Sequence, residues 1–171
     1  MKIGILGTDS RALAIGRLLA EGGHQLSFSN PRDAAAAERA AAQLGALAET
    51  PYNQAMAREL MVFACSRNDI DAAIASIGSP VEGVVLDALD GPPRAPHQGA
   101  ELLARKLDSH EVVRGLIVLP QAGANVPICG DDPVAKALVD EAFRASGCLT
   151  TDRGPLSHAV ELEPSSPAIA A

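Results

Sequence analysis

Short apolar runs alternate along this chain with alanine-rich segments whose apolar positions recur at helical spacing. The runs predict strands over residues 3–6, 25–29, 60–65, 84–89, 112–119, 128–129 and 148–151, with a short extended piece near 47–49. The segments between them predict helices over residues 12–20, 33–44, 53–58, 70–77, 100–107 and from 131–133 to about 146. Strands that alternate with helices form parallel sheets covered on both faces. The pattern therefore predicts an α/β fold, with a doubly wound, mainly parallel sheet in a three-layer αβα arrangement.

Glycine and proline positions set the boundaries between these elements. Gly22-Gly23, Gly45 and Gly147 are expected to end helices, and the three prolines within residues 90–98 predict an exposed loop. Residues 120–127 are expected to form a loop that leads into the short strand at 128–129. From Pro164 onward the chain is rich in Ser, Pro and Ala, which is typical of disorder. The chain is therefore divided into one domain over residues 1–163 and a disordered tail over 164–171.

The segment between the first predicted strand and the first helix, Gly7-Thr8-Asp9-Ser10-Arg11-Ala12, is similar to a phosphate-binding loop. In the pattern GxGxxG/A the first glycine makes a tight turn, and the second lets the backbone approach a pyrophosphate. A small third residue lets the helix pack on the strand. Gly7 and Ala12 fit, but Asp9 replaces the second glycine. Its carboxylate either repels pyrophosphate or turns away and caps the helix. Arg11 either offsets that charge, reaches a phosphate or lies in solvent. The loop favours a Rossmann-type βαβ unit over an ordinary strand-to-helix turn.

The second predicted strand ends in the turn Ser29-Asn30-Pro31-Arg32. NAD-specific domains usually place Asp or Glu here, to bind the ribose hydroxyls. Hydroxyl, amide and guanidinium donors instead suit a 2′-phosphate, and the missing carboxylate removes a repulsion. Arg32 is the best single candidate because its planar fork can hold two phosphate oxygens. The turn can also start a helix, with Asn30 as its cap and Pro31 in the first turn, and the two roles are compatible. The chemistry favours NADP(H) over NAD(H).

Composition narrows the choice of partners. The net charge is −7 and aromatic residues make up 2% of the chain, so neither a basic stripe nor stacking platforms for nucleic acid are present. The three cysteines are widely spaced and show no CxxC pattern, which argues against a structural disulfide or a metal site. No apolar run reaches the roughly 18 residues of a membrane span. We expect a cytoplasmic protein with a small-molecule substrate and no nucleic-acid or membrane partner.

Three stretches of the chain resemble NADP oxidoreductases that depend on the deazaflavin coenzyme F420. Similar modules occur in the reductase domain of STEAP-type metalloreductases and in pyrroline-5-carboxylate reductases. The stretches are KIGILGTDSRALAIGRLLAEGGHQLSFSNPRD, VVLDAL and GDDPVAKALVDEAFRASGCLTTDRGPLSHAVELEP. The third is the most specific, and it resembles the family's late helix, the strand after it and its Gly-Pro-Leu segment. Leu89, Asp90 and Gly91 depart from the turn that ends the family's strand at VVLDAL. Arg114-Gly115-Leu116-Ile117 departs from its sixth strand, and its last helix is largely absent.

The resemblance implies a set of cofactor-binding residues. A pyrophosphate would be surrounded by Gly7, Thr8, Asp9, Ser10, Arg11 and Ala12, and a 2′-phosphate would be held by Ser29, Asn30 and Arg32. The adenosine and the nicotinamide ribose would be bordered by Cys65, Ser66 and Arg67. Leu89 is the last residue of the next predicted strand, and Pro120 lies where the family places the nicotinamide and the second substrate. No catalytic residue can be named, since hydride transfer between two bound cofactors needs alignment more than an acid or a base.

The function expected from these observations is hydride transfer between NADPH and an acceptor, by an NADP-dependent oxidoreductase. The acceptor is flavin-like, with a flavin or deazaflavin as second substrate, or a small carbonyl or imine. A homodimer is expected, because a partner copy would close a shallow pocket. One alternative is a non-catalytic NADP(H)-binding module that senses redox state or docks on a partner. Another is a Rossmann-like domain that has lost nucleotide binding through Asp9.

Overall fold

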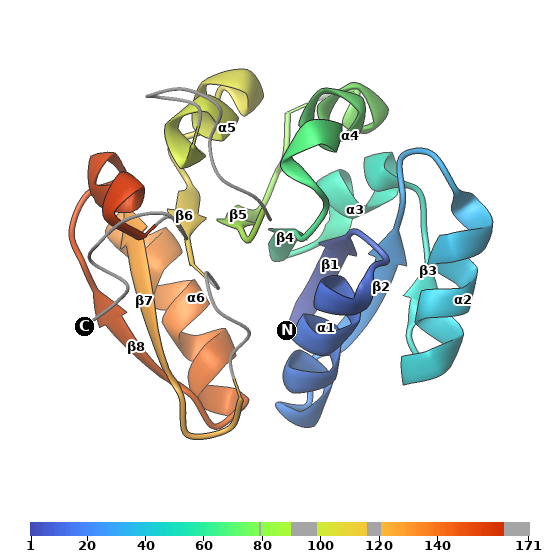
Figure 1. The fold of residues 1–171 in the computed structure, drawn as a ribbon, viewed down its shortest axis with the longest axis horizontal. Coiled ribbons are helices and arrows are strands. Elements are labelled where there is room, and N and C mark those ends of the chain that lie inside the picture. The colour runs from blue at the N-terminus through green and yellow to red at the C-terminus, as the bar shows by residue number, and fades with distance from the viewer. Residues whose placement is uncertain (79, 90–98, 116–120, 163–171) are drawn as a thin grey trace.

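The structure, a computed structural model, describes residues 1–78, 80–89, 99–115 and 121–162 (Figure 1). Its strands are β1 Lys2–Leu6, β2 Gln25–Ser29, β3 Leu47–Ala48, β4 Leu60–Phe63, β5 Val84–Asp87, β6 Val112–Arg114, β7 Asn125–Gly130 and β8 Leu149–Asp152. Its α-helices are α1 Ser10–Glu21, α2 Ala34–Leu44, α3 Pro51–Ala57, α4 Ile70–Ile77, α5 Ala100–Leu107 and α6 Pro133–Ala145. Two 3₁₀ helices complete the description, η1 Arg67–Asp69 and η2 Leu156–Leu162.

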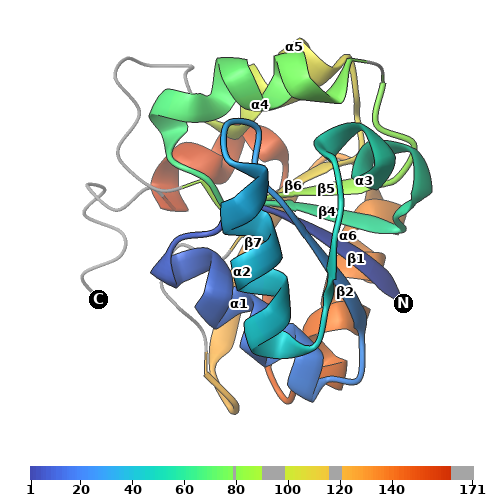
Figure 2. The ribbon, with the colours of Figure 1, turned by 90° about the vertical axis from the view of Figure 1, so that its right-hand side faces the viewer.

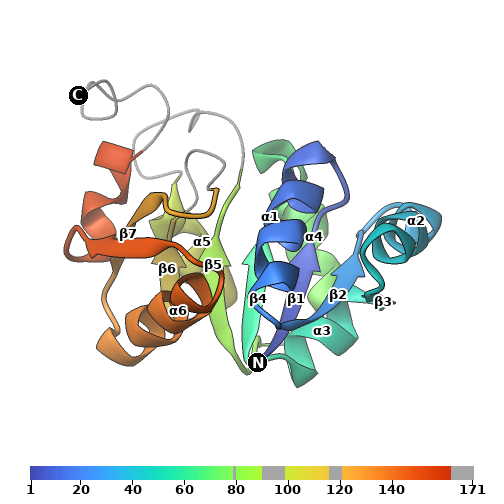
Figure 3. The same cartoon turned by 90° about the horizontal axis from the view of Figure 1, so that it is seen from below.

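The strands form one sheet in the order β3-β2-β1-β4-β5-β6-β7-β8, which Figure 3 shows from β3 on the right to β7 on the left. Every described pair is parallel except β6 with β7, which is antiparallel. The chain crosses over after β3 and returns beside β1 as β4. The order of strands therefore reverses at β1 and β4, which makes their carboxyl ends the topological switch point of a doubly wound sheet. The predicted Rossmann-type α/β fold is confirmed.

Two apolar cores hold the helices on opposite faces of the sheet. On one face, buried residues of α1, α2 and α6 pack on Ile5, Phe28 and Val62. On the other face, residues of α3, α4, α5 and η2 pack on Met61, Phe63 and Val85. Figure 2 shows this layering, with α4 and α5 above the strands and α1 and α2 below them. The three-layer αβα arrangement is confirmed.

The largest departure from the predicted elements lies at β7. Residues 125–127, predicted as loop, belong to this six-residue strand. Pro127 argued against a strand because it has no N–H to donate. The carbonyl of Ile128 accepts a hydrogen bond from the backbone of Arg153, so the neighbouring Pro127 turns its backbone toward the β6 side. The described pairing with β6 begins only at Cys129, which is opposite Arg114. The missing donor therefore costs no described ladder bond.

Some expectations fall on residues outside the described part of the chain. The predicted strand over 112–119 is confirmed at Val112–Arg114, and residues 116–119 lie outside the described ranges. The proline-rich loop at 90–98 and the tail at 164–171 also lie outside them. Helix α6 begins as predicted, since Asp132 accepts hydrogen bonds from the N–H groups of Val134 and Ala135. Within the described ranges, no helix combines the length and the apolar composition needed to cross a lipid bilayer.

Candidate dinucleotide-binding site

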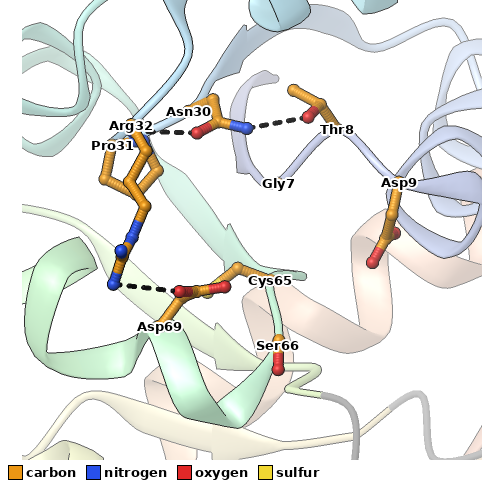
Figure 4. A pocket seen from close by; sticks show the side chains of 9 residues that line it. All are labelled: Gly7, Thr8, Asp9, Asn30, Pro31, Arg32, Cys65, Ser66 and Asp69. Carbon is orange, nitrogen blue, oxygen red and sulfur yellow. Dashed lines mark hydrogen bonds and ion pairs between the residues drawn. The ribbon is translucent and has the colours of Figure 1, made fainter.

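A pocket of about 150 Å³ opens at the switch point of the sheet (Figure 4). Its walls come from the loop after β1, the turn after β2 and the segment after β4. The residues that line it are Gly7, Thr8, Asp9, Asn30, Pro31, Arg32, Cys65, Ser66 and Asp69. Three segments far apart in the sequence meet here because parallel strands end at the same edge. In open α/β sheets, ligands bind in the crevice at this edge.

The loop after β1 has the close packing that a phosphate-binding turn requires. Gly7 has φ +142°, and a Cβ atom at this position would lie 2.5 Å from the carbonyl oxygen of Ala64. The N–H of Gly7 donates to the carbonyl of Ser29, 3.0 Å away, which fixes the loop against β2. Ala12 is fully buried in the core beneath α1. The first and third positions of the fingerprint therefore do in this structure what the pattern predicts of them.

Asp9 is the N-cap of α1. Its Oδ1 accepts a hydrogen bond from the N–H of Ala12 at 2.9 Å, and its carbonyl accepts one from Leu13. In Figure 4 its side chain lies on the far side of the loop from Asn30 and Arg32. Of the two orientations that the sequence left open, the carboxylate adopts the capping one. The replacement of the second glycine is thus used to start the helix.

Asn30 joins the first two walls of the pocket. Its Nδ2 donates to Thr8 Oγ1 at 2.8 Å, and its Oδ1 accepts from the backbone N–H groups of Arg32 and Asp33. The helix cap is Asp33, whose Oδ1 accepts from the N–H of Ala36. The interpretation of Asn30 as the cap of α2, with Pro31 in the first turn, is therefore wrong. Asn30 instead shapes the turn that presents Arg32.

Arg32 extends across the pocket toward the segment after β4. Its Nη2 lies 3.2 Å from Oδ1 of Asp69, and the exposed fractions of the two side chains are 65% and 39%. The sequence provided no acid in the turn after β2, and the structure supplies one from a different segment. The expectation that Arg32 has no carboxylate to oppose a phosphate is therefore wrong. Asp69 escaped prediction because it lies 37 positions later in the chain, although it follows β4, whose end shares this edge of the sheet.

Ser29 lies beneath the pocket and does not line it. It is fully buried, and its hydroxyl donates to Oε1 of Gln54 at 2.6 Å. Gln54 in turn donates to Oγ of Ser27, which lies two residues earlier on the same face of β2. The prediction that the Ser29 hydroxyl holds a phosphate is thus corrected. Because strand side chains alternate between faces, this hydroxyl joins the polar contacts under α3.

The segment after β4 forms the third wall. Cys65 is 7% exposed, and burial followed by the charge of Asp69 raises the pKa of its thiol to about 12. The thiol therefore stays protonated near neutral pH and adds no charge to the pocket. Ser66 caps the 3₁₀ helix η1 by accepting from the N–H of Asn68. Arg67 lies in η1, and its predicted contact with a ribose stays a prediction.

Two arginines meet the backbone at the end of β5, beside the pocket. The Nε of Arg11 donates to the carbonyl of Ala88 at 3.3 Å, so part of this side chain bridges α1 to β5. Arg114 is 1% exposed, and its Nη1 lies 3.1 Å from Oδ1 of the fully buried Asp87. The same nitrogen donates to the carbonyl of Leu89, whose side chain is packed in the core. It stays a prediction that Leu89 contacts a cofactor and that Ser10 and Arg11 contact phosphate. Pro120 lies outside the described residues.

Comparison with known proteins identifies the family. The family model described as "NADP oxidoreductase coenzyme F420-dependent" matches residues 2–91, which is more than half of the chain. The chain belongs to this family. The match contains all the residues that line the pocket. No curated protein sequence matches the chain significantly.

Solved structures share the fold at low sequence identity. A hypothetical protein from Sinorhizobium meliloti has a TM-score of 0.84 at 14% identity, over 100% of this chain and 94% of that one. A protein assigned as an F420-dependent NADP-reductase, from Arthrobacter, has 0.76 at 20%, over 94% and 87%. A reductive aminase from Aspergillus terreus, solved with NADPH and ethyl levulinate, has 0.74 at 20%, over 99% of this chain and 58% of that one. At these identities the likeness establishes the fold.

Proposed function

We propose that this chain binds NADP(H) at the switch point and transfers hydride between the cofactor and an acceptor. The observation that carries the proposal is the exposed guanidinium of Arg32, placed by Asn30 at the end of β2 and facing a glycine turn at the end of β1. In a dinucleotide fold, this strand end borders the adenosine ribose. A guanidinium there offers a paired set of donors to a 2′-phosphate, which NAD(H) lacks.

The residues present fit such a cofactor. The turn at Gly7 admits no Cβ, so the loop packs closely against the end of β4 and leads directly into the positive end of α1, where a pyrophosphate would bind. The Asp9 carboxylate is turned to its cap, and Asp69 is paired with Arg32. Each of the two carboxylates therefore already has a hydrogen-bond or ion-pair partner within the protein. The volume of about 150 Å³ suits a part of the cofactor, since whole-ligand pockets measure roughly 300–1,000 Å³.

When bound, NADPH supplies a hydride from its nicotinamide ring. The contribution of this chain is then to bind the cofactor and to orient it. Arg32 would hold the phosphate end, the loop after β1 would hold the pyrophosphate, and the protonated thiol of Cys65 would add no charge. The acceptor we propose is a flavin or deazaflavin, in line with the family description, or a small carbonyl or imine. The reductive aminase from Aspergillus terreus motivates the imine alternative.

We further propose that a second copy of the chain completes the site. The described pocket, at about 150 Å³, is smaller than the roughly 300–1,000 Å³ of a whole-ligand site, and a partner copy would add the missing wall. Sedimentation with and without NADPH tests this proposal. A dimer is expected under both conditions, and a monomer that turns over an acceptor would contradict it.

Titration and turnover together test the proposed function. Nicotinamide fluorescence should show that NADPH binds at least about tenfold more tightly than NADH, as expected for one charge-assisted phosphate site. Absorbance at the NADPH band should then fall when F420, FMN, a ketone or a cyclic imine is added. Equal affinities for NADPH and NADH would contradict the assignment of the phosphate site.

A non-catalytic NADP(H) sensor is the second candidate. It is motivated by Asp9, which replaces the second glycine of the dinucleotide fingerprint and caps α1. Tight NADPH binding without turnover of any acceptor, in a dimer of full cofactor occupancy, would select this candidate over the reductase.

A further inference from the structure

Asp69 faces Arg32 across the pocket, and among the described contacts its side chain pairs with Arg32. It stands at the start of α4, but its side chain makes no capping hydrogen bond there. Its carboxylate instead lies 3.2 Å from the guanidinium, and Figure 4 shows the two side chains reaching toward each other. Both are substantially exposed. An ion pair of this kind contributes little stability and exchanges readily with another partner.

A phosphate at Arg32 would have to share the guanidinium with this carboxylate. Arginine can bind an oxyanion with either of two edges of its guanidinium, Nε with Nη2 or Nη1 with Nη2. Nη2 has one N–H group on each edge, and it is the nitrogen that contacts Asp69. One edge remains available, but it lies close to a negative charge. Two anions on one guanidinium are within a Debye length of about 8 Å, so salt does not screen their repulsion fully.

We propose that Asp69 is a second specificity-determining residue of this site, acting against the preference that Arg32 creates. The inference rests on the proposed NADP(H) function. Asp69 weakens binding of the 2′-phosphate and leaves binding of NADH nearly unchanged, because NADH brings no charge to this corner of the pocket. The preference for NADPH is therefore narrower than Arg32 alone would give.

The test compares Asp69→Asn with the wild type and with Asp71→Asn. Asp71 lies in the first turn of the same helix, its side chain is 79% exposed, and it pairs with Lys106 outside the pocket. Both variants change the net charge by the same amount. NADPH should bind to Asp69→Asn about fivefold more tightly, as expected for removing one partly screened like charge. NADH binding to this variant, and binding of both dinucleotides to Asp71→Asn, should change less than about twofold.

A third variant shows whether Asp69 repels the 2′-phosphate or instead holds Arg32 in position to bind it. Asparagine keeps an oxygen that accepts from Nη2, whereas Asp69→Ala removes it. If repulsion dominates, Asp69→Ala also binds NADPH more tightly than the wild type. Weaker NADPH binding in Asp69→Ala with no change in Asp69→Asn would mean that Asp69 supports Arg32, and would overturn the inference. An equal gain in Asp71→Asn would overturn it as well.

Measurements on the wild type and on Arg32→Ala show whether a failure concerns the role of Asp69 or the proposed NADP(H) function. If the wild type prefers NADPH and Arg32→Ala loses that preference, the phosphate site is established. Unchanged NADPH binding in Asp69→Asn then overturns the role of Asp69 alone. If the wild type shows no preference and Arg32→Ala changes neither affinity, both proposals fail together.

Discussion

Two arginine–aspartate pairs lie at the carboxyl edge of the same sheet, with nearly equal separations and opposite surroundings. Arg32 and Asp69 are 3.2 Å apart, with 65% and 39% of their side chains exposed. Arg114 and Asp87 are 3.1 Å apart, with 1% and 0% exposed. Distance alone therefore does not tell the two pairs apart. Burial does, because it decides whether either partner can be exchanged for water or a ligand.

The buried pair is fixed by further contacts. Arg114 also donates to the carbonyls of Asp87 and Leu89, and Asp87 accepts from the N–H of Leu89. These bonds tie the ends of β5 and β6 together, which is a structural role. In the described part of the chain the exposed pair makes one contact, across an open pocket, and we propose that it acts in ligand recognition. The comparison yields predictions on stability for one pair and on binding for the other.

Removal of the buried arginine should have the largest effect. We expect Arg114→Ala to lower the free energy of unfolding by about 3–5 kcal/mol, because the Asp87 carboxylate is left buried without its counter-charge. Urea denaturation followed by circular dichroism measures the change.

A double replacement tests whether the loss of stability comes from the unpaired charge or from removal of the side chain itself. The double variant Arg114→Met with Asp87→Leu removes both charges, and it should lose less stability than Arg114→Met alone. A double variant that is less stable than the single one would show that the charges are not the reason for the loss.

Removal of the exposed arginine should act on binding. Arg32→Ala is expected to weaken NADPH binding about tenfold to a hundredfold, since charge-assisted hydrogen bonds to the phosphate are lost. NADH binding should change less than about twofold, because it has no phosphate at this site. Fluorescence titration of both dinucleotides decides the matter, and equal losses for the two would remove the assignment.

The cap of α1 should contribute an intermediate amount to stability. Asp9→Ala is expected to cost about 1 kcal/mol, since the N–H of Ala12 loses its acceptor, while Asp9→Asn keeps a capping oxygen and should cost less than half of that. Thermal melts of the two variants test the difference. A loss in Asp9→Asn as large as in Asp9→Ala would mean that charge and not capping is what matters there.

The smallest effect concerns the stability supplied by the exposed pair. Arg32→Ala should change the free energy of unfolding by less than about 0.5 kcal/mol, since exposed ion pairs contribute little. A loss approaching that of Arg114→Ala would erase the contrast between the two pairs.

Much of the fold followed from the sequence because its signals are local. Apolar runs, helical spacing and the turn glycines placed the strands and helices through α5, and Asp132-Pro133 placed the start of α6. The strand β7 was shortened in the prediction because Pro127 is a poor strand residue. Only its position beyond the paired residues of β6 makes it acceptable, and that is a tertiary fact.

The candidate site was predicted less completely, for a related reason. Gly7, Asp9 and Arg32 stand in recognisable local patterns, and all three line the pocket. Ser29 also stands in such a pattern, but the alternation of β2 directs its hydroxyl to Gln54. Asp69 carries no local signal, because its meaning depends on which strand ends meet. Prediction from the sequence therefore gave the cation of the site and missed its counter-charge.

A crystal structure of the chain with NADP⁺ bound tests the central claim most directly. We expect the 2′-phosphate to contact the guanidinium of Arg32 at the end of β2, with the pyrophosphate over the turn at Gly7. A complex in which this phosphate projects into solvent, with Arg32 still held by Asp69, would contradict the claim.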